Sequence, residues 1–402
     1  MSRRLRIALL THSVRPRGGV VHTLELADAL TALGHEVTVI ASAEPGETLF
    51  REVGFALQLI ALPALAGDLV TQVAQRIDTL VQGLPTLLQR GRVDLLHAQD
   101  SLSGNALARL QAQGLALPLW LRTVHHLDRF DDTTLMAWQE RAWRAADDVA
   151  CVSDSWARHF HSVLGVAAQR MFNGVNLQRF GLQPAPGDAQ RVQALGLPAD
   201  TGPVCLLVGG VEQRKNTLGL LHAFAQLRLR HPAWADGRLV VVGGASMLDH
   251  SSAQRAWAQA LLGHGLVEGQ CQAVLRTGPL ADALLPALMR RADVLAMPSL
   301  MEGFGLAALE ALACGTPVLV SARPPFTEHL RDAPAVAWCD PLDTASIAAG
   351  LQQAAAMPRL RSTPDVCLRH SWSHSAALHQ AWYLQRLAAR AAADASLEFT
   401  TS

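Results

Sequence analysis

Short, continuous apolar runs alternate with longer segments of helical periodicity along most of the chain. The first half contains the runs RIALLT, HEVTVIAS, VDLLHA, PLWLRTVHH and DDVACVS, and the second half contains PVCLLVGG, GRLVVVGG, QAVLRTG, ADVLAMPS and GTPVLVS. Such runs, with helices between them, are typical of parallel strands that are buried on both faces. Because the pattern stops and then restarts, the sequence predicts two doubly wound α/β domains in tandem.

The length of the chain agrees with this division. Its 402 residues exceed what one ordinary hydrophobic core holds. The segment GLQPAPGDAQ, directly after Phe180, is rich in Pro and Gly, and we place the domain boundary there. The expected domains are residues 1–182 and 183–369, and the tail 370–402, rich in Ala and Trp, is expected to be helical.

Charge and composition exclude several classes of protein. The formal net charge is zero and the sequence pI is near 7.3, so nothing indicates an electrostatic hold on nucleic acid. The first apolar run ends at His12, too early for a signal peptide, and no window reaches the roughly 18 apolar residues of a membrane span. We expect a cytoplasmic protein. Peripheral contact of Arg3, Arg4 and Arg6 with the inner membrane face is the alternative to a solvated N-terminus.

The stretch SLMEGFGLAALEALACGTPV carries two glutamates, Glu302 and Glu310, in otherwise apolar surroundings that carboxylates avoid unless they are paired. LAMPS ends a strand, Gly303 and Gly305 form a turn, and a helix is expected from about Leu306. The backbone amides of the turn would face a bound anion, while the two carboxylates accept hydrogen bonds from hydroxyl groups. A phosphate flanked by two polyols is a nucleotide sugar. Two solvated helix charges are the alternative interpretation.

Two other strand ends carry candidate ligand-binding residues, because open parallel sheets bind ligands at the carboxyl ends of their strands. Gly18 and Gly19 open a helix after the first strand, without the G-x-G-x-x-G spacing of a dinucleotide fold. His125 and His126 end a middle strand, and only one of them should face a ligand because adjacent strand residues point to opposite sides. An ordinary tight turn and a structural histidine are the alternatives.

The loop GGVEQRKN places Arg214 and Lys215 between a strand and its helix, close to Gly210. Two cations beside glycine and helix-terminal amides form a plausible phosphate cradle. Two solvated loop charges are the alternative.

Taken together, these motifs resemble the E-x7-E signature of the retaining GT-B glycosyltransferases of family four, the group 1 type. The resemblance also includes TVHH, VSDSW, NGVNLQRF and the closing segment HSWSHSAALHQAW. It implies two Rossmann-like domains with a deep cleft between them and a C-terminal helix that crosses back onto the first domain. The first domain would be on the acceptor side, and the second would bind the nucleotide sugar.

The resemblance also implies roles for individual residues. Glu310 would hold the donor ribose, Glu302 would lie beside the donor sugar, and His125 would lie near the transferred sugar. Arg214 and Lys215 would bind the diphosphate, and Gly19 would approach the phosphates. The implied catalytic residues are His125, Glu302, Lys215 and Arg214, and the implied donor-binding residues are Gly18, Gly19, Gly210, Arg214, Lys215, Gly303, Phe304, Gly305, Leu306 and Glu310.

Three positions depart from the family pattern. Gly210 stands where many members have Arg, Ala307 replaces a common Pro, and Asn176 replaces a common Asp. These departures bear on the exact donor more than on the reaction.

The expected activity is transfer of a hexosyl group from a nucleotide-diphosphate sugar, such as a UDP-sugar or GDP-mannose, with retention of configuration. The acceptor, whether glycan, lipid or small molecule, stays open, as does the choice between a covalent and a front-face route. No cofactor is expected, and no metal, because no Asp-x-Asp or His cluster at metal-ligand spacing stands near a strand end. The alternative is a nucleotide-sugar-binding or epimerase-like GT-B protein without transferase activity.

Overall fold

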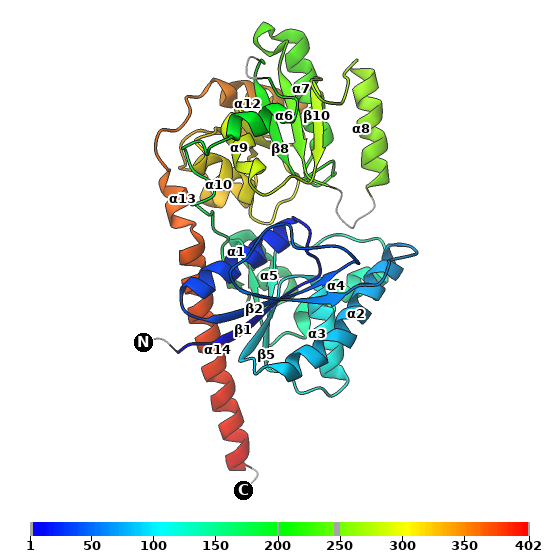
Figure 1. Cartoon of the computed structure of the whole chain (residues 1–402), viewed down its shortest axis with the longest axis vertical. Coiled ribbons are helices and arrows are strands. Elements are labelled where there is room, and N and C mark those ends of the chain that lie inside the picture. The colour runs from blue at the N-terminus through cyan, green and yellow to red at the C-terminus, as the bar shows by residue number, and fades with distance from the viewer. Residues whose placement is uncertain (1–2, 199–200, 245–249, 401–402) are drawn as a thin grey trace. The chain divides into compact units, whose positions relative to one another are not determined.

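The computed structural model describes residues 3–198, 201–244 and 250–400. The chain forms two compact units (Figure 1). Unit 1 comprises Met1–Asn173 and Trp372–Ser402, and unit 2 comprises Gly174–Ser371. The domain limits expected from the sequence, at 182/183 and 369/370, stay a prediction.

Unit 1 contains a seven-stranded sheet in which all paired strands run parallel, in the order β3-β2-β1-β4-β5-β6-β7. The strands are β1 (Arg6–Thr11), β2 (Glu36–Ala43), β3 (Ala56–Ala61), β4 (Leu95–Ala98), β5 (Leu119–Val124), β6 (Asp148–Cys151) and β7 (Gln169–Arg170). The helices of this unit are α1 (Gly18–Ala32), α2 (Leu69–Arg90), α3 (Ser101–Ala112), α4 (Thr133–Arg144), α5 (Asp154–Leu164) and α14 (Trp372–Thr400).

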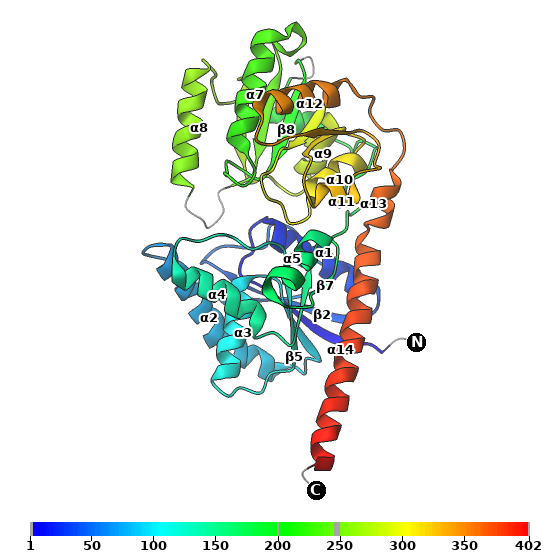
Figure 2. The same cartoon turned by 180° about the vertical axis from the view of Figure 1, so that it is seen from behind.

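The C-terminal helix α14 completes the core of unit 1. It packs against α1 (Figures 1 and 2). Its Tyr383 is fully buried and reaches His97 of β4, with 2.7 Å between the hydroxyl oxygen and Nδ1. Helices α2, α3 and α4 pack against one another in sequence order. The predicted helical tail is therefore present, and it is part of unit 1.

Unit 2 contains a six-stranded parallel sheet in the order β10-β9-β8-β11-β12-β13. The strands are β8 (Val204–Val208), β9 (Arg238–Val242), β10 (Val274–Gly278), β11 (Val294–Met297), β12 (Val318–Ser321) and β13 (Val336–Cys339). The helices are α6 (Asp188–Ala194), α7 (Thr217–Arg230), α8 (Ser251–Gly263), α9 (Leu284–Arg291), α10 (Leu306–Ala313), α11 (Phe326–His329), α12 (Thr344–Ala356) and α13 (Asp365–Arg369), with a 3-10 turn at Pro232–Trp234.

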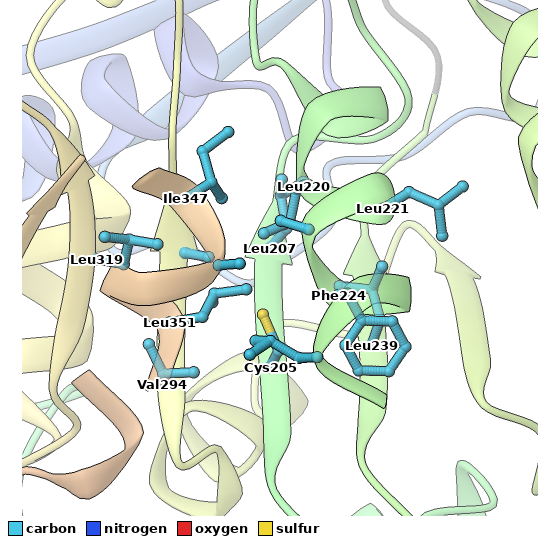
Figure 3. Packing of buried hydrophobic residues seen from close by; sticks show 14 of the residues in the cluster. Cys205, Leu207, Leu220, Leu221, Phe224, Leu239, Val294, Leu319, Ile347 and Leu351 are labelled. Carbon is cyan, nitrogen blue, oxygen red and sulfur yellow. The ribbon is translucent and has the colours of Figure 1, made fainter. Parts of the chain in front are cut away.

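The main core of unit 2 lies between its sheet and helices α7 and α12 (Figure 3). Alternate strand residues such as Leu207 and Leu239 point to this side, because successive side chains of a strand point to opposite faces. They pack with Phe224 of α7 and Leu351 of α12, and all four side chains are fully buried. Burying an apolar side chain of this size contributes roughly 1.5–3 kcal/mol.

The expected α/β architecture of two parallel sheets is confirmed. All ten apolar runs contain a strand, and three further strands, β3, β7 and β13, were not among them. Each of the three lies at or next to the end of its sheet. β3 exposes much of its length and β7 has only two residues, so neither shows the continuous apolar pattern of a strand with neighbours on both sides.

In both sheets the strand order reverses beside the first strand of the unit. The reversal lies between β1 and β4 in unit 1 and between β8 and β11 in unit 2. In doubly wound folds ligands bind outside the carboxyl ends of the strands at such a point. The loop after β8 carries Arg214 and Lys215, and the loop after β11 carries Glu302, so the fold brings both to this edge.

Two further observations concern the cysteines and the helices. All six cysteines are free thiols; Cys271 is exposed and the other five are buried. In the part of the chain that the structure describes, no helix is both long enough and apolar enough to span a membrane.

Candidate functional site

A rigid turn precedes helix α10 in unit 2. Gly305 is its N-cap residue, with φ of 90°, and a Cβ atom added there would lie 2.3 Å from Cε1 of Phe326, so only glycine fits. Phe304 is buried and stacks on His329, with ring centroids 4.6 Å apart and an interplanar angle of 7°. No side chain in the described residues caps this helix, so its first amides, those of Leu306 and Ala307, are left to other partners, while the Ala308 amide donates to the carbonyl oxygen of Gly305 at 3.0 Å.

Glu302, at the start of this turn, forms a buried ion pair with Lys215. The distance between Lys215 Nζ and Glu302 Oε2 is 2.6 Å, and one guanidinium nitrogen of Arg214 lies 3.6 Å from Oε1. The N–H of Gly303 also donates to Oε1, at 3.1 Å. Burial alone would raise the pKa of Glu302, but Lys215 and Arg214 outweigh it and lower the pKa to about 2. The carboxylate is therefore charged at neutral pH.

The cationic loop is tied to the glutamate loop by backbone as well as by charge. The N–H of Leu300 donates to the carbonyl oxygen of Arg214 at 2.9 Å. Arg214 also pairs with Glu212, at 3.4 Å, so two buried acids balance two cations. Sequence reasoning missed Glu212, although an acid two residues before a candidate cation is a signal that could have found it. Lys215 is the only lysine of the chain.

Gly210 departs from the family pattern for a steric reason. Its φ is 73°, and an added Cβ atom would lie 2.9 Å from the carbonyl oxygen of Gly244. No arginine fits this backbone conformation without a shift of the chain. The Thr217 hydroxyl at the start of α7 donates to the carbonyl oxygen of Gly210 at 2.9 Å and so fixes the turn.

Glu310 lies in α10, about one helical turn after the Gly-rich turn, as the sequence predicts. Its exposed fraction is only 9%, so it is a buried acid. The structure thus brings Glu302, Arg214, Lys215 and the turn residues together at the edge of one sheet and sets Glu310 in the helix that follows. The role of Glu310 at the ribose stays a prediction.

Unit 1 holds the other predicted residues at the carboxyl ends of β1 and β5. Helix α1 begins at Gly18, as predicted, and no side chain in the described residues caps it. A Cβ atom added at Gly19 would lie 3.7 Å from Cδ2 and 3.8 Å from Nε2 of His125, so these two residues are neighbours. Nothing lies within 4 Å of the corresponding position at Gly18.

His125 is partly buried and uncharged at neutral pH. Its Nε2 atom is buried, and none of the described residues forms a hydrogen bond with it. Burial, followed by the positive charge of Arg122 and the neighbouring His126, lowers the pKa of His125 to about 3. His126 has its own acidic neighbour, with 3.5 Å between its Nε2 and Asp128 Oδ1. The two adjacent histidines therefore have different surroundings.

The described residues contain no group of three or more His, Cys, Asp or Glu side chains that could hold a metal ion. The expected metal independence stays a prediction.

Comparison with known proteins identifies the family. Residues 16–179 match the family model described as Glycosyltransferase Family 4, and residues 193–365 match the one described as Glycosyl transferases group 1. A protein from Kineococcus radiotolerans named D-inositol 3-phosphate glycosyltransferase is 31% identical over 350 residues, which cover 79% of this chain and 78% of that protein. The chain belongs to the group 1 glycosyltransferases of family 4.

Two further matches bear on this family 4 chain. A protein of the same name from Salinispora arenicola is 33% identical over 311 residues; the match covers 72% of this chain but only 65% of the relative's length. The solved structure of Anabaena Alr3699/HepE in complex with UDP and glucose matches with a TM-score of 0.68 at 20% identity, covering 98% of this chain and all of that one. The structural similarity shows that the two proteins share a fold.

Proposed function

We propose that this chain transfers a hexosyl group from a nucleotide-diphosphate sugar to an acceptor, with retention of the anomeric configuration. Its membership of a glycosyltransferase family supports the reaction class. The observation that carries the proposal is the buried Glu302–Lys215–Arg214 cluster beside the uncapped start of α10. Free helix amides next to two cations form an anion site, which a diphosphate would fill.

The unit-2 cluster would act on the leaving group. As the bond between sugar and phosphate breaks, negative charge builds on the diphosphate oxygens. Lys215, Arg214 and the amides at the start of α10 are donors already held next to one another, and they would stabilise this charge. Glu302 holds Lys215 in place through the 2.6 Å ion pair. Because two acids already balance the two cations, the diphosphate would compete with Glu302 and Glu212 for them.

The remaining roles follow the family resemblance. We assign the ribose to Glu310, the transferred sugar to His125 and Glu302, and the approach to the phosphates to Gly19. The neutral imidazole of His125 can donate a hydrogen bond to a sugar hydroxyl or accept one from it. It adds no charge beside the positive charge that develops on the sugar as the bond to the phosphate breaks. The choice between a covalent carboxylate and a front-face route stays open.

The printed names of similar proteins suggest which substrates to test first. Anabaena HepE was solved with UDP and glucose, which makes UDP-glucose the first donor, with GDP-mannose next. The relatives are named for D-inositol 3-phosphate, which makes it the first acceptor. We assign the acceptor to residues 1–182 and the donor to residues 183–369. We also propose that no divalent metal takes part.

The proposal also places the protein in the cytoplasm, with peripheral contact of its N-terminal arginines with the inner membrane face. Arg6 pairs with Asp94 at 3.2 Å. Arg3 and Arg4 form longer ion pairs, with Asp94 at 3.8 Å and Glu36 at 3.7 Å, and their side chains are 65% and 71% exposed. Sedimentation with anionic lipid vesicles at low and high salt tests whether these two charges bind a membrane. Binding that is unchanged in an Arg3→Ala, Arg4→Ala double variant would count against the contact.

The single lysine permits a direct test of donor binding. Reductive methylation with 13C-formaldehyde keeps the positive charge and labels Lys215 alone among the side chains. We expect addition of UDP to shift the Lys215 signal, because the diphosphate replaces or joins Glu302 as its partner. The same protein should release UDP slowly from UDP-glucose, and the first glucose anomer seen by 1H NMR should be α. An unmoved lysine signal with every donor tried, and no nucleotide release, would refute the proposal.

A further inference from the structure

His22 of α1 is a buried imidazole for which the roles above give no use. It is fully buried, and its Nδ1 lies 2.9 Å from the side-chain oxygen of Asn173. Because an amide oxygen only accepts, Nδ1 carries the proton and Nε2 carries none in the neutral ring. Burial and the nearby His125 and His379 lower the pKa of His22 well below its usual value. His22 is thus a neutral ring with one tautomer fixed by Asn173.

The ring of His22 packs directly on His125. Their centroids are 4.6 Å apart and their planes meet at 76°, an edge-to-face contact. In the described part of the chain no hydrogen bond to Nε2 of His125 fixes that ring. Gly19 offers no side chain against it. The orientation of His125 therefore depends on packing, and the closest ring is that of His22.

His22 also contacts both segments through which the chain passes between its units. Asn173 is the last residue of the first segment of unit 1, and Trp372 is the first residue of the second. The ring of Trp372 lies 5.2 Å from that of His22. The two segments are joined beside this point, because the Ser375 hydroxyl donates to the carbonyl oxygen of Phe172 at 2.7 Å. The His22 imidazole thus contacts Asn173 and Trp372, at the ends of the two segments, as well as His125.

We infer that His22 is a positioning residue for His125: it fixes the orientation of that ring and ties it to the two segments at which the chain leaves and re-enters unit 1. The inference rests on the proposed function, because the orientation of His125 matters only if the chain turns over a sugar donor. It assigns no contact between His22 and the substrate. The predicted effect is on turnover, not on nucleotide affinity.

His97 provides a matched control inside the same core. It is also fully buried, and two side chains hold it, Tyr383 at 2.7 Å and Thr123 at 2.8 Å. Its ring lies 5.8 Å from His379, and that of His22 lies 6.2 Å from the same residue. The aromatic neighbours of His97 belong to α14, whereas His22 touches His125. A loss that follows from core disruption alone should appear in both variants.

The experiment measures UDP-glucose hydrolysis, UDP affinity by calorimetry and Tm in full-length protein. His22→Asn keeps an amide donor near Asn173 but removes the ring that faces His125, and we expect kcat per folded molecule to fall tenfold or more. The Kd for UDP should stay within twofold. His22→Phe restores a ring but cannot form the hydrogen bond to Asn173, so its kcat should lie between those of His22→Asn and wild type. His97→Asn should lower Tm but keep kcat within twofold.

Each outcome decides the inference. Equal losses of kcat in His22→Asn and His97→Asn, or wild-type turnover in His22→Asn, would overturn it. If His22→Asn does not fold, Asn173→Leu replaces it, because this variant keeps both imidazoles and removes only the acceptor that orients His22. Unchanged kcat in Asn173→Leu would then overturn the inference. If wild type itself neither binds UDP nor hydrolyses a donor, the proposed function fails instead, and the two failures are distinct.

Discussion

The candidate residues of unit 2 and those of unit 1 are built on opposite electrostatic principles. In unit 2 the loops after β8 and β11 bring two acids and two cations into a buried cluster, and Glu302 is charged at neutral pH. In unit 1 helix α1 and the end of β5 bring together neutral imidazoles, and His125 is uncharged. The two cations and the uncapped helix amides of unit 2 suit a diphosphate, whereas neutral polar groups suit sugar hydroxyls.

Helix starts show what the two regions share. Helices α2, α3, α4 and α12 begin with an aspartate that accepts hydrogen bonds from their first amides, namely Asp68, Asp100, Asp132 and Asp343. Helices α1, α7 and α10, next to the candidate residues, have no side-chain cap in the described residues. An aspartate cap would occupy the amides and repel a phosphate. Helices such as α5 and α8 also lack a side-chain cap, so an uncapped start indicates an anion site only where buried cations lie beside it, as at α10.

The largest expected effect comes from removing a cation from the charged cluster of unit 2. Lys215→Ala removes the closest cation to Glu302 and should cost roughly 3 kcal/mol of barrier, on the order of a hundredfold in kcat. Steady-state hydrolysis of UDP-glucose measures it. Arg276→Ala is the control. Arg276 lies on β10, at the end of the sheet, and pairs with Glu268. Its replacement should leave kcat unchanged.

The same assay in excess EDTA tests whether a metal shares this role. We expect unchanged turnover in wild type, because Lys215, Arg214 and the α10 amides neutralise the leaving group. A complete loss that added magnesium restores would show that a metal carries that charge.

The second effect concerns pH. The folded-state pKa of Glu302 is about 2, below its ordinary value of 4.5, so its stabilising contribution is present above pH 4.5 and is lost as pH falls toward 2. The shift corresponds to about 3 kcal/mol. Glu302→Gln should thus be less stable than wild type in urea at pH 7, and the difference should shrink to less than half at pH 3. The variant should also lose kcat more than donor affinity.

A stability difference between wild type and Glu302→Gln that is the same at pH 7 and pH 3 would contradict the ion-pair account. Wild-type kcat in both Glu302→Gln and His125→Ala would remove the assignment of these residues to the chemistry.

Much of the fold can be predicted from the sequence because central parallel strands are buried on both faces. Continuous runs such as that of β8, five residues long and flanked by Pro203 and Gly209, favour a buried strand over a helix. The missed strands β3 and β13 mix buried with partly exposed residues, because each lies at an end of its sheet. The two-residue strand β7 is too short for any pattern.

The candidate site also contains features that the sequence predicts and features that it does not. The turn before α10 can be predicted from the sequence, because the spacing of its glycines and acids is a local signal. The pairing of Lys215 with Glu302 spans 87 positions, and that of His22 with Asn173 spans 151, so neither has a local signal. A buried neutral histidine is the hardest case, because it carries no charge and has no characteristic spacing.

A smaller effect separates binding from chemistry within unit 2. A ribose contact is made equally in the ground and transition states, so Glu310→Ala should raise KM for the donor about tenfold and change kcat by less than about twofold. Glu310→Gln keeps one acceptor oxygen, so its KM for the donor should lie between those of wild type and Glu310→Ala. If kcat collapses while KM is unchanged, the ribose assignment is wrong.

The smallest expected effect concerns the neutral region of unit 1, where two adjacent glycines lie at the start of α1. Gly18→Ala and Gly19→Ala should each raise stability, by roughly 0.4–1 kcal/mol, because alanine gives the unfolded chain fewer conformations and neither glycine has a positive φ. A methyl group at position 19 would contact the His125 ring at 3.7 Å, an ordinary distance, whereas one at position 18 would meet nothing within 4 Å. We therefore expect donor turnover to fall roughly threefold in Gly19→Ala, because the methyl group covers the edge of His125. Gly18→Ala should match wild type in turnover while sharing the rise in Tm. Equal turnover in the two variants would show that the space beside His125 is not used by the substrate, and the neutral region of unit 1 would then be a packing feature only.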